Sequence, residues 1–124
     1  MTVKEMVDNI NNNLSEINIF FGNFLDEFYA ADYEDKKKMV FEEPLYYKVI
    51  PHSSYAYIAA MVDFLCNKYE LEKPQWIFKD RYYLKDPYFT HDFKGDMRII
   101  LLIESPLEFK IRNVFVSENA LTRV

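Results

Sequence analysis

The side chains most suggestive of chemistry gather in residues 76–89, WIFKDRYYLKDPYF. Aromatic residues alternate there with three cations: Trp76, Tyr82, Tyr83, Tyr88 and Phe89 with Lys79, Arg81 and Lys85. The first candidate binding residues among them are Trp76, Arg81, Tyr82, Tyr83 and Lys85. Aromatic rings interleaved with cations can stack and steer single-stranded nucleic acid. Tyr, Trp and Arg also dominate hot spots between proteins. Two aspartates dilute the positive charge, so the pattern favours a protein partner. A plain structural loop with its rings packed into the core is favoured over either binding role taken singly.

Lys110 and Arg112, in the closing stretch 104–124, complete the candidate binding residues. Ser105 and Pro106 are typical of a helix start, a hydroxyl cap followed by a proline at the first helical position. We expect the rings of the stretch to anchor it to the domain while Lys110 and Arg112 face outward. There they would meet either the acidic N-terminal half or an acidic partner.

No catalytic group is recognisable in the sequence. Cys66 is a single cysteine on an apolar helix face, where packing is the favoured role. His52 and His91 match no metal-ligand spacing, although His91 with neighbouring aspartates leaves a metal-assisted hydrolase as the enzyme alternative. No glycine-rich loop could cradle a phosphate. We therefore expect no enzyme, no cofactor and no metal.

Composition limits the class of protein. The chain has 124 residues, of which 50% are hydrophobic and 18% aromatic, enough for one folded domain over residues 1–124 with aromatic surface left for a partner. Residues 1–45 carry four lysines against ten acidic residues, a net charge of −6, whereas residues 46–124 carry a net of +1. Such an acidic front half discourages a whole-domain nucleic-acid footprint. No signal core or membrane span is recognisable, so we expect a cytoplasmic protein.

Hydrophobic periodicity and cap residues predict helices along most of the chain. A seam from Val3 to Phe28 predicts two helices that meet near residues 12–15, and Asp32 can cap a third over 33–42. Residues 54–69 form the clearest helix, followed by one further turn over 74–78 and a loop over 79–95. The run 97–103, MRIILLI, suits a buried strand or a buried helix, and helix is favoured because no other segment offers a sheet.

These elements predict an all-α domain, a compact bundle of five to seven helices. The side chains expected in its core are Leu14, Phe21, Phe24, Ile58, Val62, Leu65, Leu101 and Phe109.

The pattern of Pro44, the helix over 53–70, KPQW at 73–76, DPYF at 86–89 and ESPLEFKIRNVFVSENAL at 104–121 resembles a family of small bacterial helical proteins. Their closing motif reads S/A-P-x-x-F-R-x-R-x-[VI]-[FY], and the resemblance carries over to Pro106, Phe109, Lys110, Arg112 and Phe115. Lys110 departs from the motif, because many relatives have arginine there, and it keeps the charge but loses the bidentate fork. The resemblance implies an antitoxin-like protein encoded beside a nucleotidyltransferase-like gene, with no enzymatic activity. The expected function is thus a protein–protein interaction module, and a nucleic-acid-binding accessory or regulatory protein is the alternative.

Overall fold

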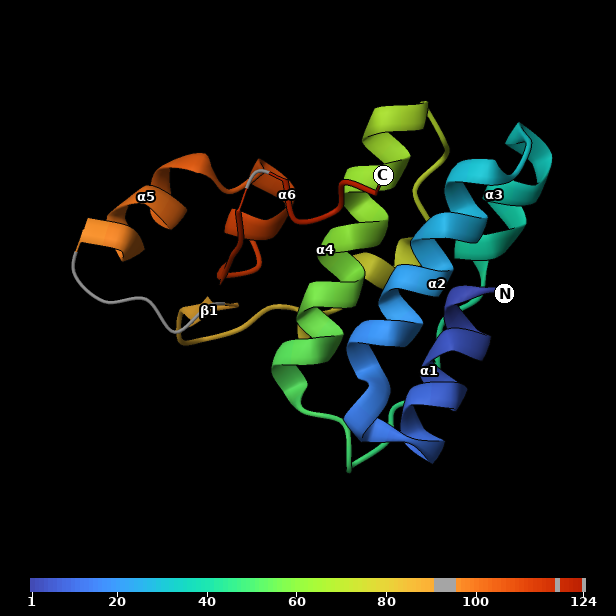
Figure 1. The fold of residues 1–124 in the computed structure, drawn as a ribbon, viewed down its shortest axis with the longest axis horizontal. Coiled ribbons are helices and arrows are strands. Elements are labelled where there is room, and N and C mark those ends of the chain that lie inside the picture. Colours follow the sequence, from blue (N-terminus) through green and yellow to red (C-terminus); the bar gives the residue numbers. More distant parts are fainter. Residues whose placement is uncertain (91–95, 118, 124) are drawn as a thin grey trace.

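The computed structural model describes residues 1–90, 96–117 and 119–123, which contain six α-helices. Figure 1 shows how these helices are arranged. The helices are α1 (Val3–Asn12), α2 (Ile17–Ala30), α3 (Tyr33–Phe41), α4 (His52–Tyr69), α5 (Asp96–Glu104) and α6 (Leu107–Lys110). Three short 3-10 turns join them: η1 (Leu14–Glu16), η2 (Gln75–Phe78) and η3 (Asp80–Tyr82). The prediction of an all-α bundle of five to seven helices is confirmed. None of the described helices is both long and apolar enough to cross a membrane.

Local capping explains where the first helices begin. Thr2 and Glu5 form a reciprocal capping box at the start of α1, with backbone-to-side-chain distances of 3.0 and 3.1 Å. Asp32 accepts the backbone N–H of Asp35 at 2.8 Å and starts α3. The break between α1 and α2 falls at residues 13–16, as the Asn run predicts.

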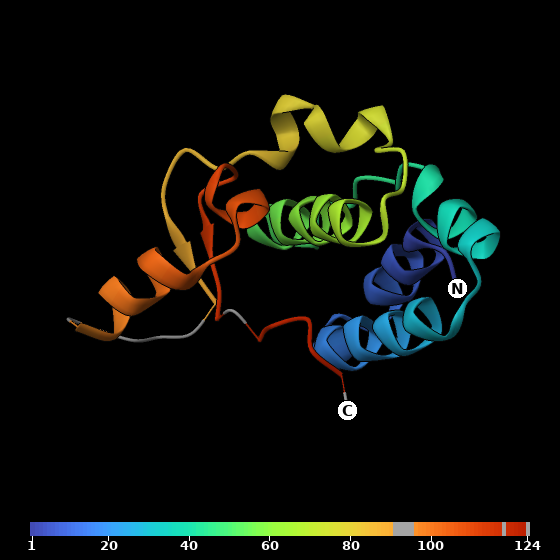
Figure 2. The ribbon, with the colours of Figure 1, turned by 90° about the horizontal axis from the view of Figure 1, so that it is seen from above.

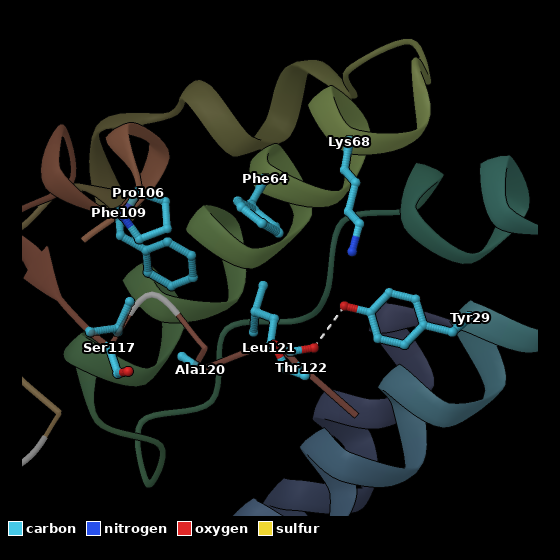
Figure 3. Close-up of a pocket in the computed structure, with 10 residues that line it drawn as sticks. Tyr29, Phe64, Lys68, Pro106, Phe109, Ser117, Ala120, Leu121 and Thr122 are labelled. Atoms are coloured by element: carbon cyan, nitrogen blue, oxygen red, sulfur yellow. Dashed lines mark hydrogen bonds between the residues drawn. The ribbon is translucent and has the colours of Figure 1, made fainter. Parts of the chain in front are cut away.

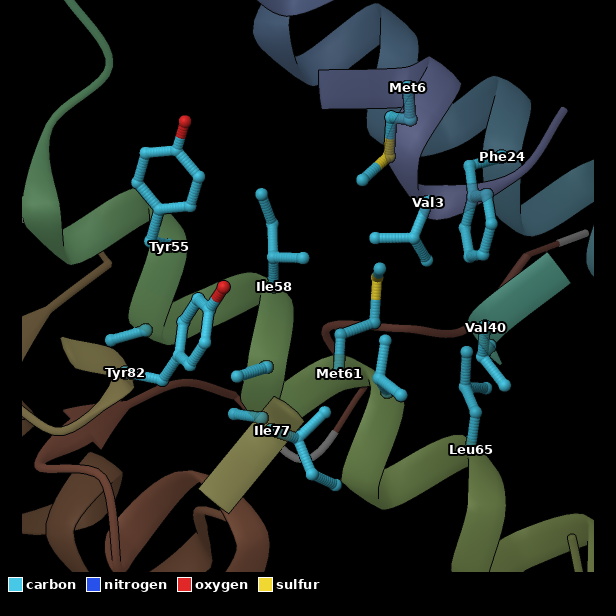
Figure 4. Packing of buried hydrophobic residues seen from close by; sticks show 14 of the residues in the cluster. Val3, Met6, Phe24, Val40, Tyr55, Ile58, Met61, Leu65, Ile77 and Tyr82 are labelled. Carbon is cyan, nitrogen blue, oxygen red and sulfur yellow. The ribbon is translucent and has the colours of Figure 1, made fainter. Parts of the chain in front are cut away.

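Helix α4 is the centre of the molecule. Figure 2 shows α1, α2 and α3 at one end, η2 and η3 along another side of α4, and α6 with the C-terminal segment beside it. Figure 4 shows the apolar side chains of these elements converging on the Ile58, Met61 and Leu65 side of α4. One cluster of buried residues therefore links the N-terminal helices to the segments that follow α4.

The predicted core is largely observed. Phe24, Ile58, Val62, Leu65 and Phe109 are fully buried in this cluster. Leu101 is buried at 3% exposure but lies outside the cluster, and Leu14 and Phe21 are only partly buried at its edge.

A two-stranded pair replaces part of the expected loop. Strand β1 (Tyr88–Phe89) runs parallel to β2 (Val114–Phe115), and the Tyr88 N–H donates to the carbonyl of Asn113 at 2.9 Å. The prediction of loop throughout 79–95 was wrong here. The prediction failed because β1 takes its hydrogen-bond partners from a segment 26 residues away, and local sequence cannot reveal such a pairing.

Candidate functional site

Two of the candidate binding residues in 76–89 lie inside the protein. Trp76 is 6% exposed and donates its indole N–H to the carbonyl of Val40 at 3.1 Å. Tyr82 is fully buried, meets the Trp76 ring edge-on with centroids 5.2 Å apart, and donates its hydroxyl to Glu43 at 2.7 Å. Burial, reinforced by the Glu43 carboxylate, raises the pKa of Tyr82. These rings fasten η2 and η3 to the α3–α4 connection and have no free face for a partner.

Glu43, in the connection between α3 and α4, binds two side chains of the segment 76–89. Its carboxylate accepts from Lys79 Nζ at 2.6 Å as well as from Tyr82. Burial acts to raise the pKa of Glu43, but the hydrogen bonds from Lys79 and Tyr82 outweigh it and hold the pKa below its usual value. The Glu43 carboxylate is therefore ionised at neutral pH, and it holds Lys79 and Tyr82 in place.

Among the five candidates in 76–89, Arg81 and Lys85 are exposed. The Arg81 guanidinium lies 5.4 Å from the ring centroid of Tyr46, which in turn stacks on Tyr55 at 4.3 Å. Tyr83 is half-buried, and its ring faces the guanidinium of another arginine at 5.0 Å. The structure thus separates the five candidates in 76–89 and does not gather them into one stacking surface.

The arginine beside Tyr83 is Arg112, which is fully buried. Its Nη1 donates to Asp63 Oδ2 and to the carbonyl of Glu108, both at 2.9 Å, and its Nη2 donates to the carbonyl of Ile77 at 3.0 Å. One side chain therefore joins α4, η2 and α6.

Aromatic rings and a second cation lie around the ion pair of Arg112 and Asp63. Phe78 lies 5.8 Å from the Arg112 guanidinium, and Lys73 Nζ lies 2.8 Å from Asp63 Oδ1. The Lys73 contact is an ion pair without hydrogen-bond alignment, and Arg112 Nε also has no hydrogen-bond partner among the described atoms. The whole arrangement neutralises a carboxylate that is 2% exposed.

The prediction that Arg112 faces outward was wrong. Asp63 lies four residues after Ala59 and three before Cys66, on the buried face of α4, so it needs a cation inside the protein. That spacing is the sequence signal of a buried ion pair, because it places an acidic residue in register with an apolar helix face.

Lys110 has a local partner as well. It is half-buried and donates to the carbonyl of Ile103 at 2.9 Å, at the C-terminal end of α5. In the acidic N-terminal half, Asp26 is instead bound by Arg123 at 2.9 and 3.1 Å, which lowers the pKa of Asp26.

The other motif positions build the C-terminal fold. Phe109 is fully buried and Phe115 is 8% exposed, so both rings do anchor the closing stretch. Ser105 does not cap α6. Its hydroxyl accepts the N–H of Val116 at 2.8 Å and lies 2.5 Å from the carbonyl of Leu101. The motif thus supplies internal contacts.

Several aliphatic side chains are exposed on α5 and α6. Figure 2 shows α5 extending away from the rest of the molecule. We call its exposed aliphatic side chains, together with those of α6 and the residue after it, the α5–α6 surface. They are between 43% and 72% exposed: Ile99, Ile100, Leu102, Ile103, Leu107 and Ile111. Residues 97–103 are helical as favoured, but the expectation of a buried helix was wrong.

The described residues line several hollows. One of them, between α2, α4 and the C-terminal segment, has a volume of about 40 Å³. Figure 3 shows its lining, where the Tyr29 hydroxyl donates to the carbonyl of Leu121 with 2.8 Å between the two oxygens. Burial raises the pKa of Cys66 to about 11, so its thiol is protonated and unreactive. Within the described residues, no group of three or more His, Cys, Asp or Glu side chains could hold a metal ion. The His91 cluster considered from sequence lies outside the described residues.

No family model matches the chain, and neither the curated proteins nor the solved structures contain a significant match to it. The function must therefore be argued from the geometry of this chain itself.

Proposed function

We propose that this protein is a protein–protein interaction module that binds through the α5–α6 surface. The observation that carries the proposal is the exposure of six large aliphatic side chains on two consecutive helices. Large aliphatic side chains that are exposed together rather than singly are typical of an interaction site. Covering the six would release on the order of 10 kcal/mol of gross hydrophobic free energy, before the cost of association.

The chemistry of the surface supports a protein as the partner. Its members are Ile and Leu, which cannot donate or accept a hydrogen bond and so cannot recognise a phosphate or a base edge. The burial of Trp76 and Tyr82 also withdraws two of the rings on which the nucleic-acid alternative depended, while Arg81 and Lys85 stay exposed. Catalysis is not part of the proposal.

The specific form suggested by the family resemblance is an antitoxin-like protein that neutralises the product of a neighbouring gene. The proposal is tested by co-expressing that product with the tagged chain and comparing two variants. Ile103→Glu places a charge on the α5–α6 surface at a position 72% exposed. Phe41→Glu is the matched control, because Phe41 is 75% exposed on α3 at the other end of the molecule.

The expected result is that wild type and Phe41→Glu retain the partner while Ile103→Glu loses it, with unchanged circular dichroism for both variants. Binding through an apolar surface should also change little between low and physiological salt, whereas binding to nucleic acid would weaken steeply. Retention of the partner by Ile103→Glu at wild-type level would refute the proposed surface.

A further inference from the structure

We infer that the hollow between α2, α4 and β1 binds an uncharged, planar aromatic molecule that carries hydrogen-bonding groups at its edge. The hollow has a volume of about 470 Å³. Sites for small molecules ordinarily measure ~300–1,000 Å³. None of the described residues that line the hollow belongs to α5 or α6, so the site is separate from the α5–α6 surface.

Two helices form the main walls of the hollow. Ile17 and Phe21 lie four residues apart at the start of α2, and Ser54 and Tyr57 lie three residues apart at the start of α4. Residues at these spacings share one face of a helix. Tyr88 of β1 adds a third wall. The walls thus come from elements that are distant in the chain, and the long helix α4 is one of them.

Aromatic rings favour a flat ligand. The rings of Phe21 and Tyr57 are stacked with their centroids 5.2 Å apart, and Phe109 meets the Tyr57 ring edge-on at 5.4 Å. These contacts hold the Tyr57 ring in place. Tyr88 is 38% exposed and stacks on no other ring in the described part of the chain. A planar ligand can therefore stack on Tyr88 without displacing a packed ring.

Polar groups on the two helical walls are available to a ligand. The Asn18 side chain and the hydroxyls of Ser54 and Tyr57 make no hydrogen bond within the described residues. Burial, with the neighbouring phenol groups of Tyr29 and Tyr88, raises the pKa of Tyr57 to about 12. Its hydroxyl therefore keeps its proton at neutral pH and can donate. Together the three side chains offer both donors and acceptors to the edge of a ligand.

The lining also determines the charge of the ligand. No Lys, Arg, His, Asp or Glu is among the described residues that line the hollow. A charged ligand would lose part of its hydration there without gaining a counter-ion, whereas an uncharged ring with a polar edge loses much less. The hollow therefore favours an uncharged molecule.

Benzamide is a suitable probe, because it is an uncharged flat ring with an amide at its edge. It is titrated into the full-length ¹⁵N-labelled chain and followed by the amide resonances in NMR spectra. We expect saturable shifts at Phe21, Tyr57 and Thr90, which line the hollow, with a dissociation constant on the order of 1 mM for so small a ligand. Benzoate has the same ring with a charge, and cyclohexanecarboxamide has the same amide without a flat ring. Each should bind roughly tenfold more weakly.

Two variants test the polar groups. Ser54→Ala and Tyr57→Phe should each weaken benzamide binding roughly fivefold, because each removes one hydrogen-bonding group from the wall. Their thermal stability should be close to that of wild type, since neither hydroxyl has a partner among the described residues. Ser53→Ala is the matched control, because it removes the same group one residue earlier in α4, outside this hollow, and should bind as wild type does.

Three outcomes would overturn the inference. The first is the absence of saturable shifts at the walls of the hollow. The second is equal affinity for benzamide, benzoate and cyclohexanecarboxamide. The third is wild-type binding of benzamide by both Ser54→Ala and Tyr57→Phe. None of these measurements depends on the partner of the α5–α6 surface, so failure here leaves the proposed function to its own test.

Discussion

Two neighbouring parts of the C-terminal third differ in the kind of side chain that they bury. Around Arg112, a charged side chain is fully buried, whereas on α5 the aliphatic Ile103 is 72% exposed. The two residues are only nine positions apart. Burial in this region therefore does not follow the hydropathy of each residue.

The difference follows from the partners that each segment meets. Arg112 reaches Asp63 of α4 and two backbone carbonyls, so its donors are largely satisfied inside the protein. Helix α5 extends from the body and packs little against other described elements, so its apolar side chains remain in water. Arg112 thus finds its partners inside the protein, whereas the exposed aliphatic side chains of α5 find few among the described residues.

The largest effect should come from removing everything after Glu104. The lost segment contributes Phe109, Arg112, Val114 and Val116 to the buried interior. Without them Asp63 would also lose its arginine. We expect the shortened chain to be largely unfolded by circular dichroism and to show no cooperative thermal transition. A transition at the wild-type temperature would show that this segment is not part of the core.

Replacing Arg112 by Met should destabilise the protein by ~3–5 kcal/mol in urea unfolding, because Asp63 is left buried without its main counter-ion. Lys110→Met is the matched control, and its loss should stay below about 1 kcal/mol, because Lys110 is half-buried and bonds a single carbonyl. The double variant Arg112→Met with Asp63→Leu should regain most of the loss. Equal effects of the two single substitutions would remove the contrast between the buried and the surface cation.

A matched pair of isoleucines measures the same contrast with one chemistry. Ile58→Ala, in the core, should cost ~2–5 kcal/mol of unfolding free energy. Ile103→Ala on α5 should change it by less than about 0.5 kcal/mol at a concentration where the chain is monomeric. A large loss for Ile103→Ala under those conditions would mean that α5 packs against its own chain.

The smallest effect concerns Glu43 and is dependent on pH. Its pKa is lowered in the folded state, so its contribution is present above the unfolded value of about 4.3 and is lost as pH falls through the folded value. Tyr82→Phe removes one of its hydrogen bonds and should cost about 1 kcal/mol at neutral pH. The measurement is urea unfolding at neutral pH and below pH 4. The difference between wild type and Tyr82→Phe should shrink in acid, and a constant difference would contradict this role for the carboxylate.

The sequence by itself determined the helices and most of the core, because caps and periodicity act within a few residues along the chain. Thr2, Asp32 and the apolar spacing of α4 predict their elements without knowledge of the rest of the fold. Phe24, Ile58 and Phe109 were predicted as core residues for the same reason.

Which charged groups are buried and which apolar groups are exposed depends on segments that are far apart in the chain. Arg112 lies 49 residues from Asp63, and Tyr82 lies 39 residues from Glu43, so local sequence does not reveal the partner of either side chain. The run MRIILLI predicts burial in any local analysis, yet no other element of the described chain covers most of α5. Hydropathy determines whether a side chain favours burial. The arrangement of distant segments determines whether the chain itself buries it.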